Sequence, residues 1–451
     1  MATSIIIIPT AIATIAILII GEDTVLLSDF EKIIRRAMKN GKFNRNFFIR
    51  KVKNTIFLLF LMASCKNNGQ KITNKAFTPT QETSQEIILG ANRMDLYLPL
   101  LQNKKVGIVT NQTGIVKTQN GKYVHLVDTL LKKDVKVIKV FAPEHGFRGQ
   151  ADAGEVVKDG KDSKTGLPIV SLYGKNKKPT KEQLADLDVV LFDLQDVGVR
   201  FYTYISTLHY VMEACAEQQL PVVVLDRPNP NAHYIDGPVL EPEFKSFIGM
   251  HPVPVVYAMT IGEYGQMING EKWLNNNLVA NLKVIPLANY THQTPYSLPV
   301  KPSPNLPNDV SINLYPSLCF FEGTNISMGR GTSWQFQVYG SPYLENTSFS
   351  FTPKPNEGDK KPMFNGKVCY GEDLRNHPTL SKLNFTWLKK ALEQSKGVKM
   401  PFFTSSFNKI AGNATLKQQI IDQKSDDEIR KTWQPALDKF KQTRKKYLIY
   451  K

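Results

Sequence analysis

The chain has 451 residues, of which 42% are hydrophobic and 22% are charged, and its formal net charge is +17. This is an ordinary globular composition, with enough residues for two domains after a leader is set aside. The positive charge suits an anionic partner, but the basic residues are scattered and no nucleic-acid-binding motif is present, so we expect no nucleic acid partner. The four cysteines include no Cys-x-x-Cys spacing, which argues against a zinc ribbon or a redox pair.

The amino-terminal part, residues 1–64, is expected to be a leader. A basic stretch at 50–53 precedes an apolar run at 56–62, which is too short to span a bilayer, and small residues follow. Small residues directly before Cys65 resemble a bacterial lipobox, so we expect Cys65 to be lipidated. An ordinary signal peptide with a chance cysteine is the alternative.

A second apolar run at 5–20 is also short of a membrane span. We expect the true start at Met38, with an extended gene prediction upstream; a genuine anchor helix is the alternative. Residues 65–85 are polar and are expected to form a flexible tether.

The segment 86–245 has the pattern of a doubly wound α/β domain. Short apolar runs, rich in β-branched residues, alternate with segments of helix length. This alternation predicts a Rossmann-like, mostly parallel sheet with helices on both faces. The expected strands are 106–109, 135–140, 189–192 and 221–225, and the expected helices include 125–133, 181–187 and 204–219.

Polar loops follow each of these strands. They begin at Thr110, Pro143, Asp193 and Asp226, and they are rich in Asn, Asp, Glu, His, Arg and Tyr. Because the carboxyl ends of parallel strands meet at one edge of a sheet, these loops should converge there. The sequence therefore predicts a cleft that handles a polar ligand.

The remainder, 246–451, is expected to form a second, smaller α/β domain. Thr260 and Glu263 have the spacing of a capping box at a helix start. A strand is expected at 281–287, a stiff Pro-rich segment at 299–307, and a carboxyl-terminal helix at 425–446 that is broken or kinked at Pro435.

Several enzyme classes lack their motifs in this chain. No Gly-x-Gly-x-x-Gly follows a strand, and no Walker motif, His-Glu-x-x-His or Gly-x-Ser-x-Gly is present. We therefore expect neither a cofactor nor a metal. A metal-dependent hydrolase using His145 and Asp193 as ligands remains a distant alternative.

Five loops stand together in the order found in one family. They are Thr-Asn-Gln-Thr-Gly at 110–114, Ala-Pro-Glu-His-Gly-Phe-Arg-Gly at 142–149, the run at 193–204, Asp-Arg-Pro-Asn-Pro at 226–230 and Phe-Glu-Gly-Thr-Asn at 321–325. From about Leu89 to the carboxyl end, the chain resembles the bacterial exo-β-N-acetylmuramidases of cell-wall recycling, long catalogued as a domain of unknown function. The resemblance implies a Rossmann-like domain, a smaller second α/β domain and an active-site cleft between them.

The same resemblance implies a function. The family releases N-acetylmuramic acid from the non-reducing end of peptidoglycan fragments, so muropeptides or disaccharides are the expected substrates. With the lipobox, it implies an exported protein of the cell envelope, lipid-anchored on the periplasmic side of a membrane or at the cell surface. The rival hypothesis is a non-catalytic lipoprotein that binds muropeptides or anionic glycan.

Two carboxylates are the candidate catalytic groups. Glycoside hydrolysis needs a proton donor for the leaving oxygen and support for an oxocarbenium-like centre. We expect Glu144 to be the acid, unless it only pairs with Arg148, and Glu322 to be the second carboxylate. The nucleophile stays open between Asp193, Asp196 and the 2-acetamido group of the substrate.

The remaining candidates would bind the substrate. At least one of Arg148, Arg200 and Arg330 should hold the lactyl carboxylate in a bidentate fork, while the others pair with acidic side chains. Tyr202 and Tyr204 share a face in an extended segment and could form an aromatic wall, although Tyr204 could equally pack in the core. The other expected substrate-binding residues are Asn111, His145, Asp193, Asp196, Asn229, Asn305 and Asn325.

Overall fold

The computed structural model describes residues 85–148, 159–344 and 348–450. The leader, the tether and the lipidation expected at Cys65 lie outside these residues. In the part of the chain that is described, no helix combines the length and the apolar character needed to cross a bilayer.

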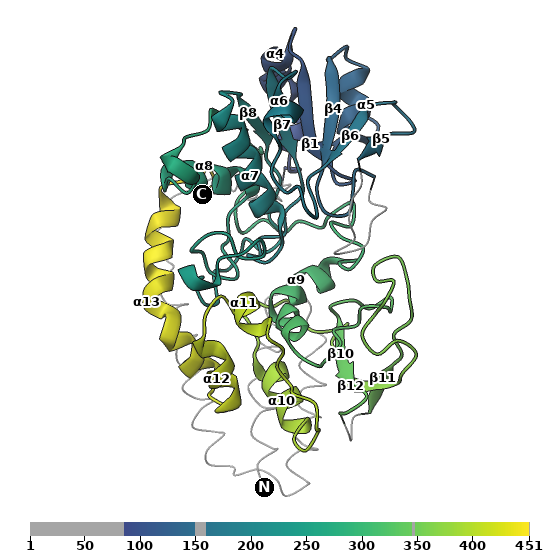
Figure 1. The fold of residues 1–451 in the computed structure, drawn as a ribbon, viewed down its shortest axis with the longest axis vertical. Coiled ribbons are helices and arrows are strands. Elements are labelled where there is room, and N and C mark those ends of the chain that lie inside the picture. Colours follow the sequence, from purple (N-terminus) through teal and green to yellow (C-terminus); the bar gives the residue numbers. More distant parts are fainter. Residues whose placement is uncertain (1–84, 149–158, 345–347, 451) are drawn as a thin grey trace, which may run out of the picture. The chain divides into compact units, whose positions relative to one another are not determined.

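The main sheet confirms the Rossmann-like fold (Figure 1). From the central strand β1 the chain moves outward through β4 and β6, then returns to β7 and continues to β8 and β9, with all six parallel. This is the order of a doubly wound sheet. Across the sheet the strands are β5 (Gly160–Lys161, antiparallel to its neighbour), β6 (Pro168–Ser171), β4 (Val137–Ala142), β1 (Val106–Thr110), β7 (Val189–Asp193), β8 (Val222–Leu225) and β9 (Leu282–Ile285).

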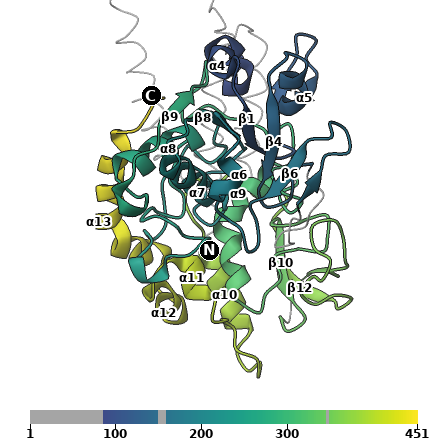
Figure 2. The same cartoon turned by 45° about the horizontal axis from the view of Figure 1, so that its top comes forward.

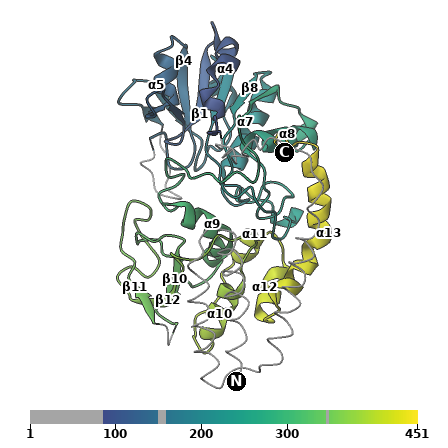
Figure 3. The ribbon, with the colours of Figure 1, turned by 180° about the vertical axis from the view of Figure 1, so that it is seen from behind.

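Helices cover both faces of this sheet (Figures 2 and 3). Along β7, Val189 and Leu191 pack in one apolar cluster, while Val190 and Phe192 pack in the other, because successive side chains of a strand point to opposite faces. Helices α4 (Met94–Leu101) and α5 (Leu126–Leu131) contribute to the first cluster, and α6 (Lys181–Leu184), α7 (Tyr204–Glu217) and α8 (Ile261–Gly270) to the second.

The sheet takes elements from beyond the boundary expected near residue 245. Strand β9 pairs with β8 at the edge of the sheet, and α8 packs against both. The capping box expected at the start of α8 is present: Thr260 Oγ1 accepts from the backbone N–H of Glu263, whose side chain accepts from the N–H of Thr260. Local pattern placed this helix correctly, but only strand pairing shows which domain it joins.

The second part of the described chain has its own small sheet. Its three antiparallel strands lie in the order β10, β12, β11. The elements are α9 (Asp309–Leu318), η4 (Cys319–Gly323), β10 (Val338–Ser341), β11 (Phe349–Phe351), β12 (Cys369–Asp373), α10 (Thr386–Gln394), α11 (Phe407–Ala411), α12 (Thr415–Ile421) and α13 (Asp426–Lys445). Shorter elements elsewhere are η1 (Gly90–Asn92), β2 (Ile115–Lys117), β3 (Tyr123–His125), η2 (Pro242–Phe244) and η3 (Asn275–Asn277).

Helix α13 carries the chain back to the first domain. It continues through Pro435 without the expected break, and Trp433 and Leu437 on either side of the proline are buried, so packing holds the helix together across the lost hydrogen bond. In its last turn Arg444 donates to the carbonyl of Ala258, and beyond the helix the Tyr450 hydroxyl donates to Asp226 over 2.6 Å.

Candidate active site

The two predicted catalytic glutamates line one cavity of about 290 Å³. Its walls come from the carboxyl ends of β4 and β6, from the turn that precedes α7, and from α9, η4 and the loops around them. The polar lining residues are Glu144, His145, Tyr173, Tyr202, Thr203, Ser303, Asn305, Tyr315, Glu322 and Arg330, and the apolar ones are Phe201, Phe247, Ile248, Leu306 and Phe336.

Glu144 lies just past the end of β4 and is half-buried. Its Oε2 accepts a hydrogen bond of 3.1 Å from the hydroxyl of Thr203. Burial, together with the charge and hydrogen bond of the Glu144 carboxylate, raises the pKa of Tyr173. Tyr173 therefore keeps its proton at neutral pH, and two hydroxyl donors hold this carboxylate.

His145, the next residue, is buried in a strained backbone conformation. Its φ is +74° and that of Gly146 is +73°, so two successive residues adopt left-handed geometry. For a residue with a side chain this costs on the order of 1 kcal/mol or more. The tight turn explains how the chain leaves β4 with both Glu144 and His145 lining the cavity.

Glu322 lies on η4 and pairs with Arg330. The Arg330 Nη2 donates to Glu322 Oε1 over 2.5 Å, and both side chains remain about a quarter to a third exposed, at 24% and 32% respectively. Burial opposes the charge of Arg330, but the Glu322 carboxylate outweighs it and raises the arginine pKa. The guanidinium is therefore held charged beside the carboxylate, and the pair stays accessible to a ligand.

Of the other predicted binding residues, Tyr202 and Asn305 also reach this cavity. The Tyr202 hydroxyl donates to the carbonyl of Pro302 over 2.7 Å, which fixes its ring as a wall. The Asn305 amide Nδ2 donates to the carbonyl of Gly358 over 2.7 Å, whereas its buried Oδ1 has no hydrogen bond to the described residues.

Arg148 does not line the cavity. Its guanidinium binds Asp162 through two hydrogen bonds, of 3.1 and 2.8 Å, and a third contact of 3.3 Å reaches Asp128. Its planar group also lies 4.4 Å from the centre of the Phe147 ring. Arg148 therefore pairs with these two carboxylates, and the alternative in which Glu144 serves only as its partner is not what the structure shows.

Arg200 does not line the cavity either and is fully buried. It donates to four backbone carbonyls, those of Pro238, Val253, Ile410 and Ala411, at 2.6 to 3.1 Å. Burial without a carboxylate partner lowers its pKa to about 10. Since Ile410 and Ala411 end α11, Arg200 ties the first domain to the last turn of a helix from the second, where the helix dipole favours a cation.

Asp193 and Asp196 point into the protein and do not line the cavity. Asp193, at the end of β7, forms a buried two-bond pair with Arg227, at 2.6 and 2.9 Å. Asp196 Oδ2 accepts from the Tyr257 hydroxyl and from the N–H of Gly198, while its buried Oδ1 has no partner among the described residues. Burial raises the pKa of Asp196 to about 6.

The remaining predicted residues are buried in turns and packing. The Asn111 Nδ2 donates to the Tyr204 hydroxyl over 2.5 Å, and the Tyr204 ring packs edge-on against Tyr202 in the core at the start of α7. The Asn229 amide donates to the carbonyl of Met259 over 2.9 Å. The buried Asn325 side chain has no hydrogen bond to the described residues.

Comparisons with known proteins connect this geometry to a family. Models of the amino-terminal and carboxyl-terminal domains of the exo-beta-N-acetylmuramidase NamZ match residues 106–310 and 313–450. The chain belongs to the NamZ family of exo-β-N-acetylmuramidases. The members of this family are glycoside hydrolases. Membership therefore supports the enzyme and not the alternative, a non-catalytic binding lipoprotein.

Curated and solved relatives agree with this membership. The chain is 38% identical over 384 residues to the peptidoglycan beta-N-acetylmuramidase NamZ of Bacillus subtilis strain 168, covering 78% of this chain and 89% of that protein. Crystal structures of two DUF1343 family proteins from Bacteroides fragilis NCTC 9343 match with TM-scores of 0.74 and 0.69, at 42% and 27% identity. Each covers 81% of this chain and 99% of its own.

Sequence reasoning missed several residues of the cavity that this NamZ-family chain presents. Thr203 stands inside a loop already singled out, between the two predicted tyrosines, but a short, uncharged side chain carries no signal of its own. Tyr173 follows the apolar strand β6 as Glu144 follows β4, so the same strand-end rule would have found it. Tyr315 and Phe336 carry no local signal, because only tertiary packing brings them to the cavity.

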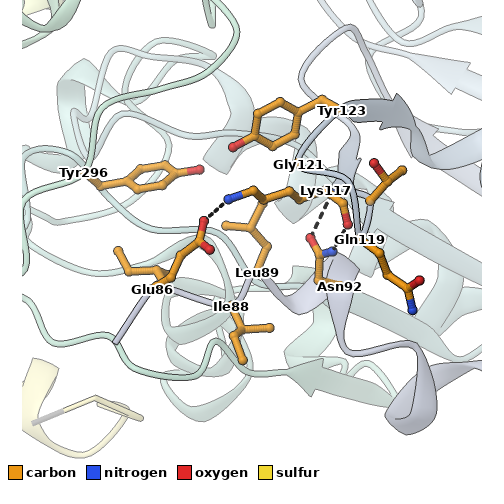
Figure 4. A pocket seen from close by; sticks show the side chains of 11 residues that line it. Glu86, Ile88, Leu89, Asn92, Lys117, Gln119, Gly121, Tyr123 and Tyr296 are labelled. Carbon is orange, nitrogen blue, oxygen red and sulfur yellow. Dashed lines mark hydrogen bonds and ion pairs between the residues drawn. The ribbon is translucent and has the colours of Figure 1, made fainter. Parts of the chain in front are cut away.

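A larger cavity, of about 570 Å³, lies where the described chain begins (Figure 4). Lys117 pairs there with Glu86, and the Asn92 amide bonds both backbone groups of Lys117. Figure 4 shows the hydroxyl groups of Tyr123 and Tyr296 turned toward the same ion pair. None of the predicted site residues lines this cavity. In the described ranges, no group of three or more His, Cys, Asp and Glu side chains could hold a metal ion.

Proposed function

We propose that this protein hydrolyses the bond that links a terminal N-acetylmuramic acid to the rest of a peptidoglycan fragment. The observation that carries the proposal is the meeting of Glu144 and Glu322, 178 residues apart in the sequence, in one cavity with Arg330. The B. subtilis relative is named as a peptidoglycan β-N-acetylmuramidase, which supports the same substrate class.

Glu144 acts as the general acid. In its protonated form it donates to the glycosidic oxygen, the bond to the anomeric carbon breaks, and the departing sugar leaves with that proton. The hydroxyls of Thr203 and Tyr173 position the carboxyl group for this transfer. A partly enclosed cavity with several aromatic walls also limits the water that competes for its hydrogen bonds.

Glu322 carries the opposing negative charge. As the carboxylate partner of Arg330 at the cavity, it supports the positive charge that develops at the anomeric carbon. With Asp193 and Asp196 both outside the cavity, attack on that carbon falls to Glu322 itself or to the acetamido group that Glu322 orients. Either route consumes one water to release the sugar.

Arg330 recognises the lactyl carboxylate that distinguishes muramic acid from glucosamine. Arg148 binds Asp162 and Arg200 binds four carbonyls, so among the three predicted arginines only Arg330 has a guanidinium at the cavity. Only its Nη2 is bonded to Glu322, which leaves the other donors of the fork for a second carboxylate.

We further propose that the mature protein begins at a lipidated Cys65 and works in cell-wall recycling on the outer side of a membrane. The basic stretch, the apolar run and the small residues before Cys65 support this. Partition of the expressed chain into a detergent phase, compared with Cys65→Ser, tests the anchor. Equal partition of the two proteins into water would contradict it.

The decisive test of the activity uses a protein that starts after Cys65. It is incubated with para-nitrophenyl N-acetylmuramide and, separately, with the N-acetylglucosaminide, and nitrophenol release is followed for wild type and Glu144→Gln. We expect release from the muramide alone, and its loss in the variant. A folded wild-type protein that releases nitrophenol from neither compound would overturn the proposal.

A further inference from the structure

A second cavity, of about 470 Å³, adjoins the active site. The two cavities share their walls: Ser303, Asn305 and Leu306 line the active site, while Pro304 and Pro307 between and beside them line the second. Arg330 likewise faces the active site, and Gly331 next to it faces the second cavity. We call this second cavity the adjoining groove.

Three hydrogen bonds hold the far wall of the adjoining groove against the active-site segments. The backbone N–H of Lys354 donates to the carbonyl of Gly331 over 2.8 Å. The amide of Asn356 donates to the carbonyl of Thr332 over 2.9 Å, and Asn305 reaches Gly358 as described above. The groove is therefore a fixed extension of the active site, with Asn305 as the partition.

The chemistry of this groove differs from that of the active-site cavity. No aromatic side chain lines it, so it offers no stacking platform for a sugar ring. Lys301 and Lys354 line it instead, are exposed, and form no ion pair with any carboxylate of the described residues. The single acidic lining residue is Glu357, which leaves a net positive charge in the groove.

We infer that the adjoining groove binds the glycan chain on the leaving side of the scissile bond, and that Lys301 and Lys354 bind a carboxylate on that chain. The inference rests on the proposed function and names its preferred substrate. Every substrate of such an enzyme carries a leaving sugar, whereas a peptide stem is optional. We therefore assign the space next to the cleaved sugar to the leaving glycan chain and not to a peptide stem. The carboxylate is the lactyl group of the next muramic acid.

The test uses the full-length protein and compares two peptide-free substrates, a disaccharide and a tetrasaccharide. Both carry N-acetylmuramic acid at the non-reducing end. Only the tetrasaccharide has a second lactyl carboxylate. We expect wild type to have the higher kcat/KM on the tetrasaccharide, through a lower KM. Lys301→Gln and Lys354→Gln should each remove up to about fivefold of that advantage, as exposed ion pairs do. The advantage should also shrink at high salt.

Two control variants sharpen the result. Glu357→Gln removes the opposing charge, so it should enlarge the advantage of the tetrasaccharide. Lys382→Gln removes an exposed lysine outside the groove and should leave the ratio unchanged. Neither lysine substitution in the groove should alter turnover of para-nitrophenyl N-acetylmuramide, because this compound has no leaving glycan chain.

Two outcomes would overturn the inference while leaving the proposed function intact. In the first, the lysine variants hydrolyse the nitrophenyl muramide normally and keep the wild-type ratio between tetrasaccharide and disaccharide. In the second, they lose activity only on a disaccharide that bears a peptide stem, which would assign the lysines to the peptide. If neither wild type nor any variant releases nitrophenol from the nitrophenyl muramide, the proposed function is wrong, and this inference is wrong with it.

Discussion

Two places along the carboxyl ends of the parallel strands contrast in how their loops are used: one beyond β1 and β7, here called the closed edge, and one beyond β4 and β6, here called the open edge. In a doubly wound sheet the general crevice lies where the strand order reverses, here between β1 and β7, beyond Thr110 and Asp193. In this protein the Asp193–Arg227 pair occupies that position, and Arg227 also donates to the carbonyl of Ile115. The open cavity lies instead beyond β4 and β6, beside Glu144 and Tyr173.

The difference shows that polar residues at strand ends have two separate uses. At the reversal point Asp193 and Arg227 are buried and paired with each other, so they fix the loops. Beyond β4 and β6 they keep an open face toward elements of the second domain, η4 and the loop with Arg330. Similar sequence patterns thus give structural support at one edge and chemistry at the other.

The largest expected effect is a loss of activity from a substitution at the open edge. Glu144→Gln keeps the shape of the side chain and an acceptor for Thr203 but removes the transferable proton. We expect kcat on the nitrophenyl muramide to fall by roughly 10²- to 10⁴-fold, with an unchanged melting temperature. A variant that retains most of its activity would show that the acid lies elsewhere.

A substitution at the closed edge should lower the stability of the protein. Asp193→Asn leaves the guanidinium of Arg227 buried without its countercharge. We expect the free energy of unfolding, measured with urea, to fall by about 3 to 5 kcal/mol, with kcat of the folded fraction nearly unchanged. A folded, stable variant with no activity would place Asp193 in the chemistry instead.

A third change tests recognition at the open edge. Arg330→Gln should reduce the preference for the muramide over the glucosaminide by roughly 10- to 100-fold, because a charge-assisted pair to the lactyl group is lost. The ratio of the two rates isolates this effect from general damage to Glu322. Arg148→Gln is the matched control, since its partners Asp128 and Asp162 lie outside the cavity, and should leave the ratio as it is.

The smallest effect concerns Asp196 at the closed edge and depends on pH. Because burial raises its pKa to about 6, the native state holds a proton there that the unfolded chain releases near pH 4. The stability from this group is present below that range and is lost as the pH rises through about 6. Asp196→Asn keeps an acceptor for Gly198 and needs no proton, so relative to wild type it should gain about 1 to 3 kcal/mol between pH 4 and pH 7.

Urea titrations of the two proteins at several pH values measure this difference. Parallel stability curves for wild type and Asp196→Asn would contradict the raised pKa. The comparison with Asp193→Asn is direct, since both changes neutralise an aspartate of the same loop and are expected to differ in sign at neutral pH.

The sequence by itself determined the main alternation of strands and helices in the first domain, the capping box at Thr260 and the loops at which chemistry could occur. These follow from local rules: β-branched runs favour strands, a threonine or serine ahead of a glutamate starts a helix, and polar residues cluster where strands end. The motifs also predicted both catalytic candidates, Glu144 and Glu322, before their meeting in one cavity was visible.

Only the tertiary structure decided which polar residues of those loops face a ligand. Arg148, Arg200 and Arg330 are equivalent in pattern, yet one binds two aspartates, one binds four carbonyls and one stands at the cavity. Their partners are Asp162, the end of α11 and Glu322, and in the case of Arg200 some of these lie about 210 residues away in the chain. A guanidinium binds whichever acceptors packing brings to it, and local sequence patterns do not predict long-range packing.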